Sequence, residues 1–112
     1  MQGGELKVGL LVPLATFGEM AEQEALLAAA ERIGAEPVLI EGRAHDLLAS
    51  VENGTIHLLA GGLPKDTPLS SQIALTKPWG QAAIAGKVQD AVWGLRKGEN
   101  AFLLALNRAL PS

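Results

Sequence analysis

Two histidines and a few acidic and hydroxyl side chains are the residues of this chain that could do chemistry. His45 and His57 are the only histidines, and Glu41 and Asp46 lie near His45 in the sequence. Imidazole and carboxylate groups are the ligands that Zn²⁺ binds in proteins. The two histidines, however, lack the i,i+4 spacing that puts two ligands on one face of a helix. We therefore predict a hydrogen-bonded strand histidine at position 57, with no metal site and no cofactor.

Two further segments resemble catalytic or phosphate-binding motifs. The run Gly61-Gly62-Leu63-Pro64-Lys65 has the glycines and the lysine of a phosphate loop, but it lacks the Walker spacing and precedes turn residues instead of a helix. Ser70 and Ser71 have no nucleophile-elbow motif and no partner base. Because no nucleophile, metal or cofactor constellation emerges, the sequence predicts that the chain is not an enzyme.

Length and composition are those of one compact globular domain. The chain has 112 residues, of which 48% are hydrophobic and 19% charged. A net charge of −3 without a Lys/Arg cluster argues against binding to nucleic acid. The absence of cysteine excludes disulfides and thiolate chemistry. No apolar run approaches the roughly 20 residues that span a bilayer, so we predict no membrane insertion.

Strand and helix signals alternate along the chain. We expect strands at 6–12, 38–40, 56–60 and 72–76, and helices at 18–32, 44–52 and 100–110. Thr16 is the expected N-cap of the first helix, with Glu19 completing a capping box. Weaker strand candidates at 82–86 and 91–95 are separated by the polar segment 87–90, and their pairing stays open. Alternation through short loops predicts a single three-layer, doubly wound α/β lobe with a mainly parallel sheet.

The acidic residues of the first helix and the two tryptophans are expected to have structural roles. Glu19, Glu22 and Glu24 are expected to form a solvated acidic face near the start of the first helix. Trp79 and Trp93 are expected to pack in the core or at an interface instead of forming a ligand box.

The order of short motifs between residues 33 and 79 resembles one protein family. The motifs are Ile33-Gly34, Val38-Leu39-Ile40, Asp46-Leu47-Leu48 through Asn53-Gly54, Ile56 to Gly62, and Leu75-Thr76-Lys77-Pro78-Trp79. They resemble bacterial extracellular solute-binding protein family 3, the polar amino-acid-binding components of ABC transporters. The resemblance implies a type II periplasmic-binding-protein-like fold.

The end of the chain also resembles this family, in which a strand, a Lys-Gly turn and a helix return from the second lobe to complete the first. Here Trp93-Gly94-Leu95-Arg96-Lys97-Gly98 leads into the last helix, and only a short segment separates it from Trp79. The resemblance therefore implies a single lobe. Residues 1–79 would form its N-terminal part, 80–90 a short connection in place of the second lobe, and 91–112 the returning strand and terminal helix.

The ligand positions implied by the resemblance are only partly present. Matching Gly62-Leu63 to the family's Gly-Met pair puts Leu69 where an arginine would clamp the α-carboxylate, and Ala44 where an aromatic residue would stack on the ligand. Open α/β sheets bind ligands at the carboxyl ends of their strands. The candidate ligand-binding residues expected at that edge are Thr16, Phe17, Gly61, Gly62, Leu63, Asp66 and Trp79.

Two functions follow as expectations. The first is a non-catalytic binding module for a small polar solute, with a reduced or altered ligand site. For it the resemblance implies a periplasmic or extracytoplasmic location and an ABC permease as partner. The second is a structural or interaction domain that has lost ligand binding and pairs with a second copy or with another part of a parent protein. Residues 1–5 lack the basic segment and apolar core of a signal peptide, so a cytoplasmic location stays open.

Overall fold

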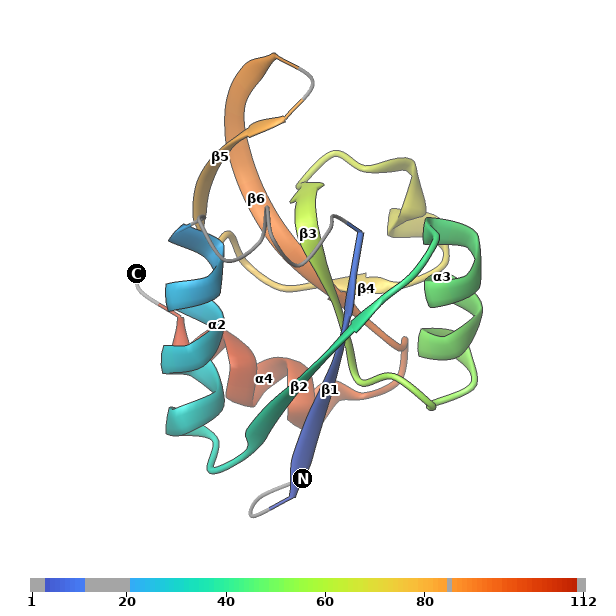
Figure 1. The fold of residues 1–112 in the computed structure, drawn as a ribbon, viewed down its shortest axis with the longest axis vertical. Coiled ribbons are helices and arrows are strands. Elements are labelled where there is room, and N and C mark those ends of the chain that lie inside the picture. Colours follow the sequence, from blue (N-terminus) through green and yellow to red (C-terminus); the bar gives the residue numbers. More distant parts are fainter. Residues whose placement is uncertain (1–3, 12–20, 85, 111–112) are drawn as a thin grey trace.

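The computed structural model describes residues 4–11, 21–84 and 86–110, and a twisted sheet runs through the centre of the molecule (Figure 1). In chain order the elements are β1 (Glu5–Leu10), α2 (Ala21–Arg32), β2 (Glu36–Glu41), α3 (Ala44–Glu52), β3 (Leu58–Pro64), the 3₁₀ helix η1 (Pro68–Ser71), β4 (Ala74–Leu75), β5 (Gly80–Ile84), β6 (Lys87–Leu95) and α4 (Asn100–Ala109). Within the described residues the strand order is β2-β1-β3-β6-β4, and β5 pairs with β6.

The first half of the chain has the predicted parallel, doubly wound arrangement. Strand β1 pairs in parallel with both β2 and β3, so Val8 lies between Leu39 and Leu58. Helix α2 connects β1 to β2 and helix α3 connects β2 to β3, and the two helices lie on opposite sides of the sheet (Figure 1). Gly34, with a φ of 73°, ends α2 in the left-handed conformation that the Ile33-Gly34 motif predicts. The N-cap expected at Thr16 lies outside the described residues.

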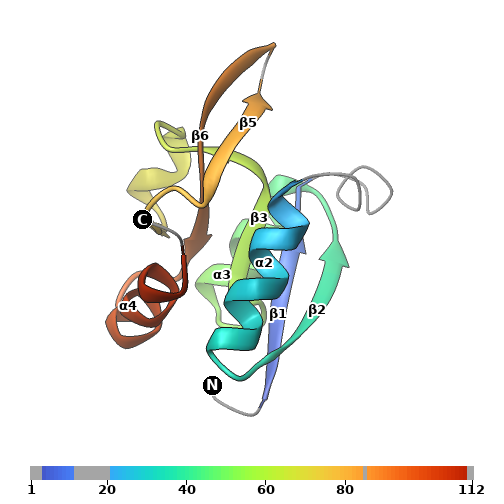
Figure 2. The same cartoon turned by 90° about the vertical axis from the view of Figure 1, so that its left-hand side faces the viewer.

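The second half adds antiparallel strands, for which periodicity gave no partner. Strand β6 runs antiparallel to β3, β4 and β5. The expected break at 87–90 is wrong, because these residues form the first half of β6 and pair with β5 in a hairpin. The hairpin rises above the body of the molecule in Figures 1 and 2. The strand expected at 72–76 is shorter, since only Ala74 and Leu75 pair with β6.

Strand β3 begins and ends later than expected, at Leu58 and Pro64 instead of 56 and 60. Its pairing with β6 shifts register between Leu59 and Leu63, and Gly61 within this shift has a φ of 108°. Glycine has no Cβ and adopts that conformation at little cost, so the irregularity in the pairing of β3 with β6 is accommodated at Gly61. The Gly61-Gly62-Leu63 segment is consequently a continuation of the strand, and the turn begins at Lys65.

Two apolar clusters fill the two faces of the sheet. We call the first the α2/α4 cluster, since Leu6, Val8 and Leu10 from β1 pack there against helices α2 and α4. We call the second the α3 cluster; it holds Leu47, Val51, Ile56, Leu59, Leu63, Ile73 and Val92. In Figure 2, α2 lies in front of β1 and β3. Among the described residues no helix has the length and apolarity needed to cross a bilayer.

Candidate functional site

Glu22 is buried at the carboxyl edge of the sheet, although it belongs to the first turn of α2. The residue has no solvent-exposed surface. Its Oε2 accepts a hydrogen bond from the Gly61 backbone N–H at 2.9 Å and another from the Trp93 indole Nε1–H at 2.9 Å. Burial of a carboxyl group is tolerated when hydrogen bonds of this kind satisfy it. One side chain thus joins helix α2 to strands β3 and β6.

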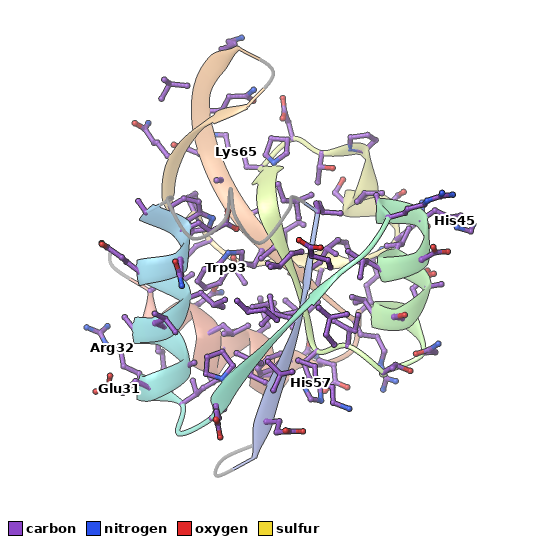
Figure 3. The ribbon with its side chains drawn as sticks, in the orientation of Figure 1. Glu31, Arg32, His45, His57, Lys65 and Trp93 are labelled. Atoms are coloured by element: carbon purple, nitrogen blue, oxygen red, sulfur yellow. The ribbon has the colours of Figure 1, made fainter. Side chains whose placement is uncertain are left out.

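Trp93 and Trp79 stack beside this carboxyl group. Their ring centroids are 6.4 Å apart and their planes differ by 20°. Trp93 is fully buried and Trp79 is 6% exposed. The predicted packing role of both rings is borne out by their place in the α2/α4 cluster. Figure 3 shows Trp93 near the centre of the molecule. We call Glu22, Gly61, Trp79 and Trp93 the edge cluster.

Thr76 joins the segment before Trp79 to the strand that carries Trp93. Its backbone N–H donates to the Trp93 carbonyl at 2.9 Å, and its Oγ1 accepts from the Trp93 N–H at 3.0 Å. The Trp79 N–H donates to the Ala91 carbonyl at 2.9 Å. The Trp79 Nε1–H, in contrast, is buried and has no partner among the described residues. Buried donors are rarely left unpaired, so this indole is a distinctive feature of the edge cluster.

The solvated acidic face expected on the first helix is corrected at one position. Glu24 is exposed as predicted, whereas Glu22 is buried, and Glu19 lies outside the described residues. Helical spacing contained the signal, because Glu22 stands four positions before Leu26 and seven before Ala29, both buried on the same stripe. A carboxyl group on an apolar stripe is a better indicator of a buried hydrogen-bond acceptor than of a solvated face.

The structure brings some of the predicted ligand-binding residues together and separates others. Gly61 and Trp79 both belong to the edge cluster, where Gly61 donates to Glu22 and Trp79 stacks on Trp93, and Gly62 follows Gly61 in β3. Leu63 packs on the other face of the sheet, in the α3 cluster. Asp66 is exposed in the turn after β3. Thr16 and Phe17 lie outside the described residues.

Beside Asp66, an ion pair links the end of β3 to the hairpin. Lys65 Nζ lies 3.3 Å from Asp90 Oδ2, and Gln81 Nε2 donates to Asp90 Oδ1 at 3.2 Å. Hydrogen bonds from Gln81 and then from Lys65 lower the pKa of the Asp90 carboxyl group below its usual value. Both charged side chains are accessible to water, so the pair orients the hairpin more than it stabilises the fold.

The two histidines lie apart. The His45 side chain is 94% exposed, and its Nδ1 lies 3.2 Å from Asp46 Oδ1. His57 lies at the other end of the sheet, where its Nδ1 accepts the Lys7 N–H at 2.9 Å. Figure 3 shows the separation of the two labelled rings. Within the described ranges, no group of three or more His, Asp or Glu side chains has the geometry to hold a metal ion.

Comparison with known proteins gives matches of structure but not of sequence. Neither a protein-family model nor a curated protein sequence matches the chain. Domain 1 of TmArgBP in its arginine-bound form matches with a TM-score of 0.75 at 20% identity, over 96% of this chain and 90% of that one. The chain has the fold of a periplasmic amino-acid-binding lobe.

Two further solved structures have the same fold. The L-cystine solute receptor of Neisseria gonorrhoeae, in its unliganded open conformation, matches with a TM-score of 0.73 at 10% identity, over 96% of this chain and 86% of that one. Truncated ArgBP of T. maritima (residues 20–233), in its arginine-bound form, matches with a TM-score of 0.71 at 10% identity, over 96% and 94%. At these identities the likeness establishes the three-dimensional arrangement, in agreement with the fold that the sequence motifs predicted.

Proposed function

We propose that this chain is a non-catalytic binding module with the single-lobe architecture of amino-acid receptors, and that it binds a small polar solute. The observation that carries the proposal is the match to domain 1 of TmArgBP, because that structure is one domain in an arginine-bound form and 90% of it is covered. One lobe of this fold is thus sufficient to hold an amino acid in that protein.

The proposed single-lobe boundaries are supported by the match to one domain of TmArgBP, of which this chain covers 90%. In our proposal residues 1–79 and 91–112 form the lobe. Residues 80–90, which include strand β5 and the first four residues of β6, take the place of a second lobe.

The proposed ligand site is the carboxyl edge of the sheet. It comprises Thr16, Phe17, Gly61, Gly62, Leu63, Asp66 and Trp79, with Leu63 contributing its backbone. Glu22 would act as a positioning residue, since its carboxyl group holds the Gly61 N–H and the Trp93 ring. The unpaired Trp79 Nε1–H is a donor that a ligand oxygen could satisfy after a small ring movement.

The site is proposed to be altered relative to a typical amino-acid receptor. Leu69, at the position where the resemblance implies a clamping arginine, packs against the α3 cluster and presents no charge. A ligand would then lack the bidentate contact that guanidinium groups make with α-carboxylates. We expect a weaker-binding or differently charged solute, delivered outside the cytoplasmic membrane to an ABC permease.

A thermal-shift screen of amino acids, small organic acids and metal ions, with light scattering on the same sample, tests the proposal. A ligand at about 100 times its Kd adds about 2.7 kcal/mol of stability, which raises the Tm of a domain of this size by several degrees. Trp79→Phe keeps the stacked ring but removes the indole donor, so it should reduce the shift. His45→Gln, on an exposed side chain, is the matched control and should leave the shift unchanged.

The opposite result is equally specific. A folded protein that no solute stabilises, together with a dimer mass by light scattering, would reject the binding module. That outcome would support the interaction domain, with the carboxyl edge serving as the contact between two copies.

A further inference from the structure

A large cavity lies at the amino-terminal edge of the sheet, away from the proposed solute site. Its volume is about 860 Å³, within the usual range for small-molecule sites. The end of α2, the turn before β3, the loop after β6 and helix α4 surround it. His57 at this edge and Lys65 just after β3 mark the two ends of that strand in Figure 3.

Positive charge is concentrated in this cavity although the whole chain has a net charge of −3. Arg32, Arg96 and Arg108 line it, and Glu99 is the one acidic residue among its described lining residues. Three guanidinium groups against one carboxylate leave two positive charges, with His57 neutral. We call the cavity defined by Arg32, Arg96, Arg108 and His57 the basic pocket.

Two of the arginines are held in place by the protein. Arg32 Nη1 donates to the Ala109 carbonyl at 2.9 Å, at the end of α4. Arg96 Nη2 lies 3.2 Å from Glu99 Oε1, while its Nη1 lies against Gly54, where a Cβ would approach it to 3.2 Å. Guanidinium groups fixed in this way keep further N–H donors available, because each carries five. Arg108 has no hydrogen bond or ion pair with any residue that the structure describes.

His57 adds a neutral donor. Its Nδ1 accepts the Lys7 N–H, and its own backbone N–H donates to the Lys7 carbonyl at 2.9 Å. The accepting role of Nδ1 assigns the ring proton to Nε2. Burial and then the positive charge of Lys7 lower the pKa of the imidazole, which favours the neutral form of the ring. The Nε2–H has no partner among the described residues.

The remaining wall of the basic pocket is apolar. Ile33, Ile56 and Phe102 line it together with the alanines of α4. Ile33 and Ile56 are buried, and Phe102 is half-buried. A ligand that fits both parts of the pocket has an anionic head for the guanidinium groups and a hydrocarbon body for this wall.

We propose that the basic pocket is a second binding site, for a small monocarboxylate with an apolar body. Carboxylates match the planar fork of arginine through two parallel hydrogen bonds. The site uses residues from the end of the lobe opposite to the carboxyl edge, so it does not depend on the proposed solute site.

Calorimetric titration of the whole chain with phenylacetate, octanoate, phenylacetamide and inorganic phosphate tests this site. We expect saturable binding of the two carboxylates, and at least about tenfold weaker binding of the amide, because a charge-assisted hydrogen bond is lost. Arg108→Gln should weaken carboxylate binding by about tenfold. Arg43→Gln removes the same charge from an exposed position outside the pocket and should have no effect.

A second variant separates shape from charge. Ala101 lines the basic pocket and is exposed, so Ala101→Phe should fill the pocket and abolish binding while the protein keeps its circular dichroism spectrum. Equal binding of phenylacetate and phenylacetamide would overturn the proposal, and so would an absence of saturable binding. Binding of phosphate alone would overturn the carboxylate class. Binding that responds to Trp79→Phe but not to Arg108→Gln would assign the ligand to the carboxyl edge instead.

Discussion

Glu22 shows how one residue can connect the sequence pattern to the candidate site. Its place on the apolar stripe of α2 determines that its carboxyl group enters the core, and the core offers it the Gly61 and Trp93 N–H groups. Neither partner follows from sequence spacing, because the two donors lie 39 and 71 positions away. The composition of a helix face thus predicts that a polar group is buried, but only the folded structure shows which groups form hydrogen bonds with it.

We predict that Glu22→Ala destabilises the protein by about 3–5 kcal/mol, because it leaves two buried N–H donors unpaired and opens a cavity beside the tryptophans. Glu22→Gln keeps one oxygen acceptor and should cost about half as much. Urea unfolding followed by tryptophan fluorescence measures both values. Glu24→Ala, on an exposed position of the same helix, should stay within about 0.5 kcal/mol of the parent. A similar small loss for Glu22→Ala would show that the edge cluster tolerates unpaired donors.

Among the elements, the apolar strands that alternate with helices were predictable, and the hairpin formed by β5 and the first half of β6 was not. Strands β1 and β3 are mainly apolar, and their parallel pairing follows from the helices that connect β1 to β2 and β2 to β3. The first half of β6 is exposed or half-buried and holds one apolar residue, Val88, so no alternation marks it as a strand. Backbone pairing with β5 and the Lys65–Asp90 and Gln81–Asp90 contacts hold it in place. The periodicity of the sequence does not show that these segments and side chains lie close together.

The packing of β6 against the segment before β4 depends on Gly94. A Cβ at this position would overlap Ile73 Cδ1, and Ile73 is 1% exposed within the α3 cluster. We predict that Gly94→Ala destabilises the protein by about 1–3 kcal/mol, because a packed core yields little to an added methyl group. Gly80→Ala is the matched control, since nothing lies within 4 Å of its Cβ position. Thermal unfolding by circular dichroism measures both.

A second-site change identifies the cause of that loss. Ile73→Val removes the Cδ1 methyl group, so the double variant Gly94→Ala/Ile73→Val should be more stable than the sum of the two single losses implies. Strict additivity would mean that Ile73 turns away freely and that the overlap is not the source of the destabilisation.

At the scale of the whole molecule, the sequence predicted a doubly wound lobe completed by a returning strand and a terminal helix, but not the contacts that hold this helix. The fold depends on contacts between the last helix and two earlier segments of the chain. Asn107 Oδ1 accepts the Lys77 N–H, and the Ala109 carbonyl accepts from Arg32. The basic pocket lies between elements that are far apart in the sequence, so no local motif predicted it. The carboxyl edge was predictable because the ends of parallel strands converge by topology.

The pH dependence of stability is a property of the whole molecule that follows from two groups. The pKa of His57 is lowered by burial and by Lys7, so the unfolded chain binds more protons as pH falls below the ordinary value of 6.5. Stability should be fully present above that pH and decline as pH falls toward the folded-state pKa, below which this contribution is constant. Asp90, whose pKa is also lowered, should add a small second decline below its ordinary value of 3.8.

Urea unfolding at pH values from 8 to 3 tests this profile, with one variant that removes the histidine step and one control. His57→Asn can retain an acceptor for the Lys7 N–H but cannot titrate, so it should remove the decline below pH 6.5 and leave the acidic step. His45→Gln, which changes the exposed histidine, should preserve both steps. If His57→Asn and the parent lose stability in parallel between pH 6.5 and 5, then protonation of His57 does not disturb the junction of β1 and the residues before β3. That result would contradict the lowered pKa of His57 and therefore the neutral imidazole assigned to the basic pocket.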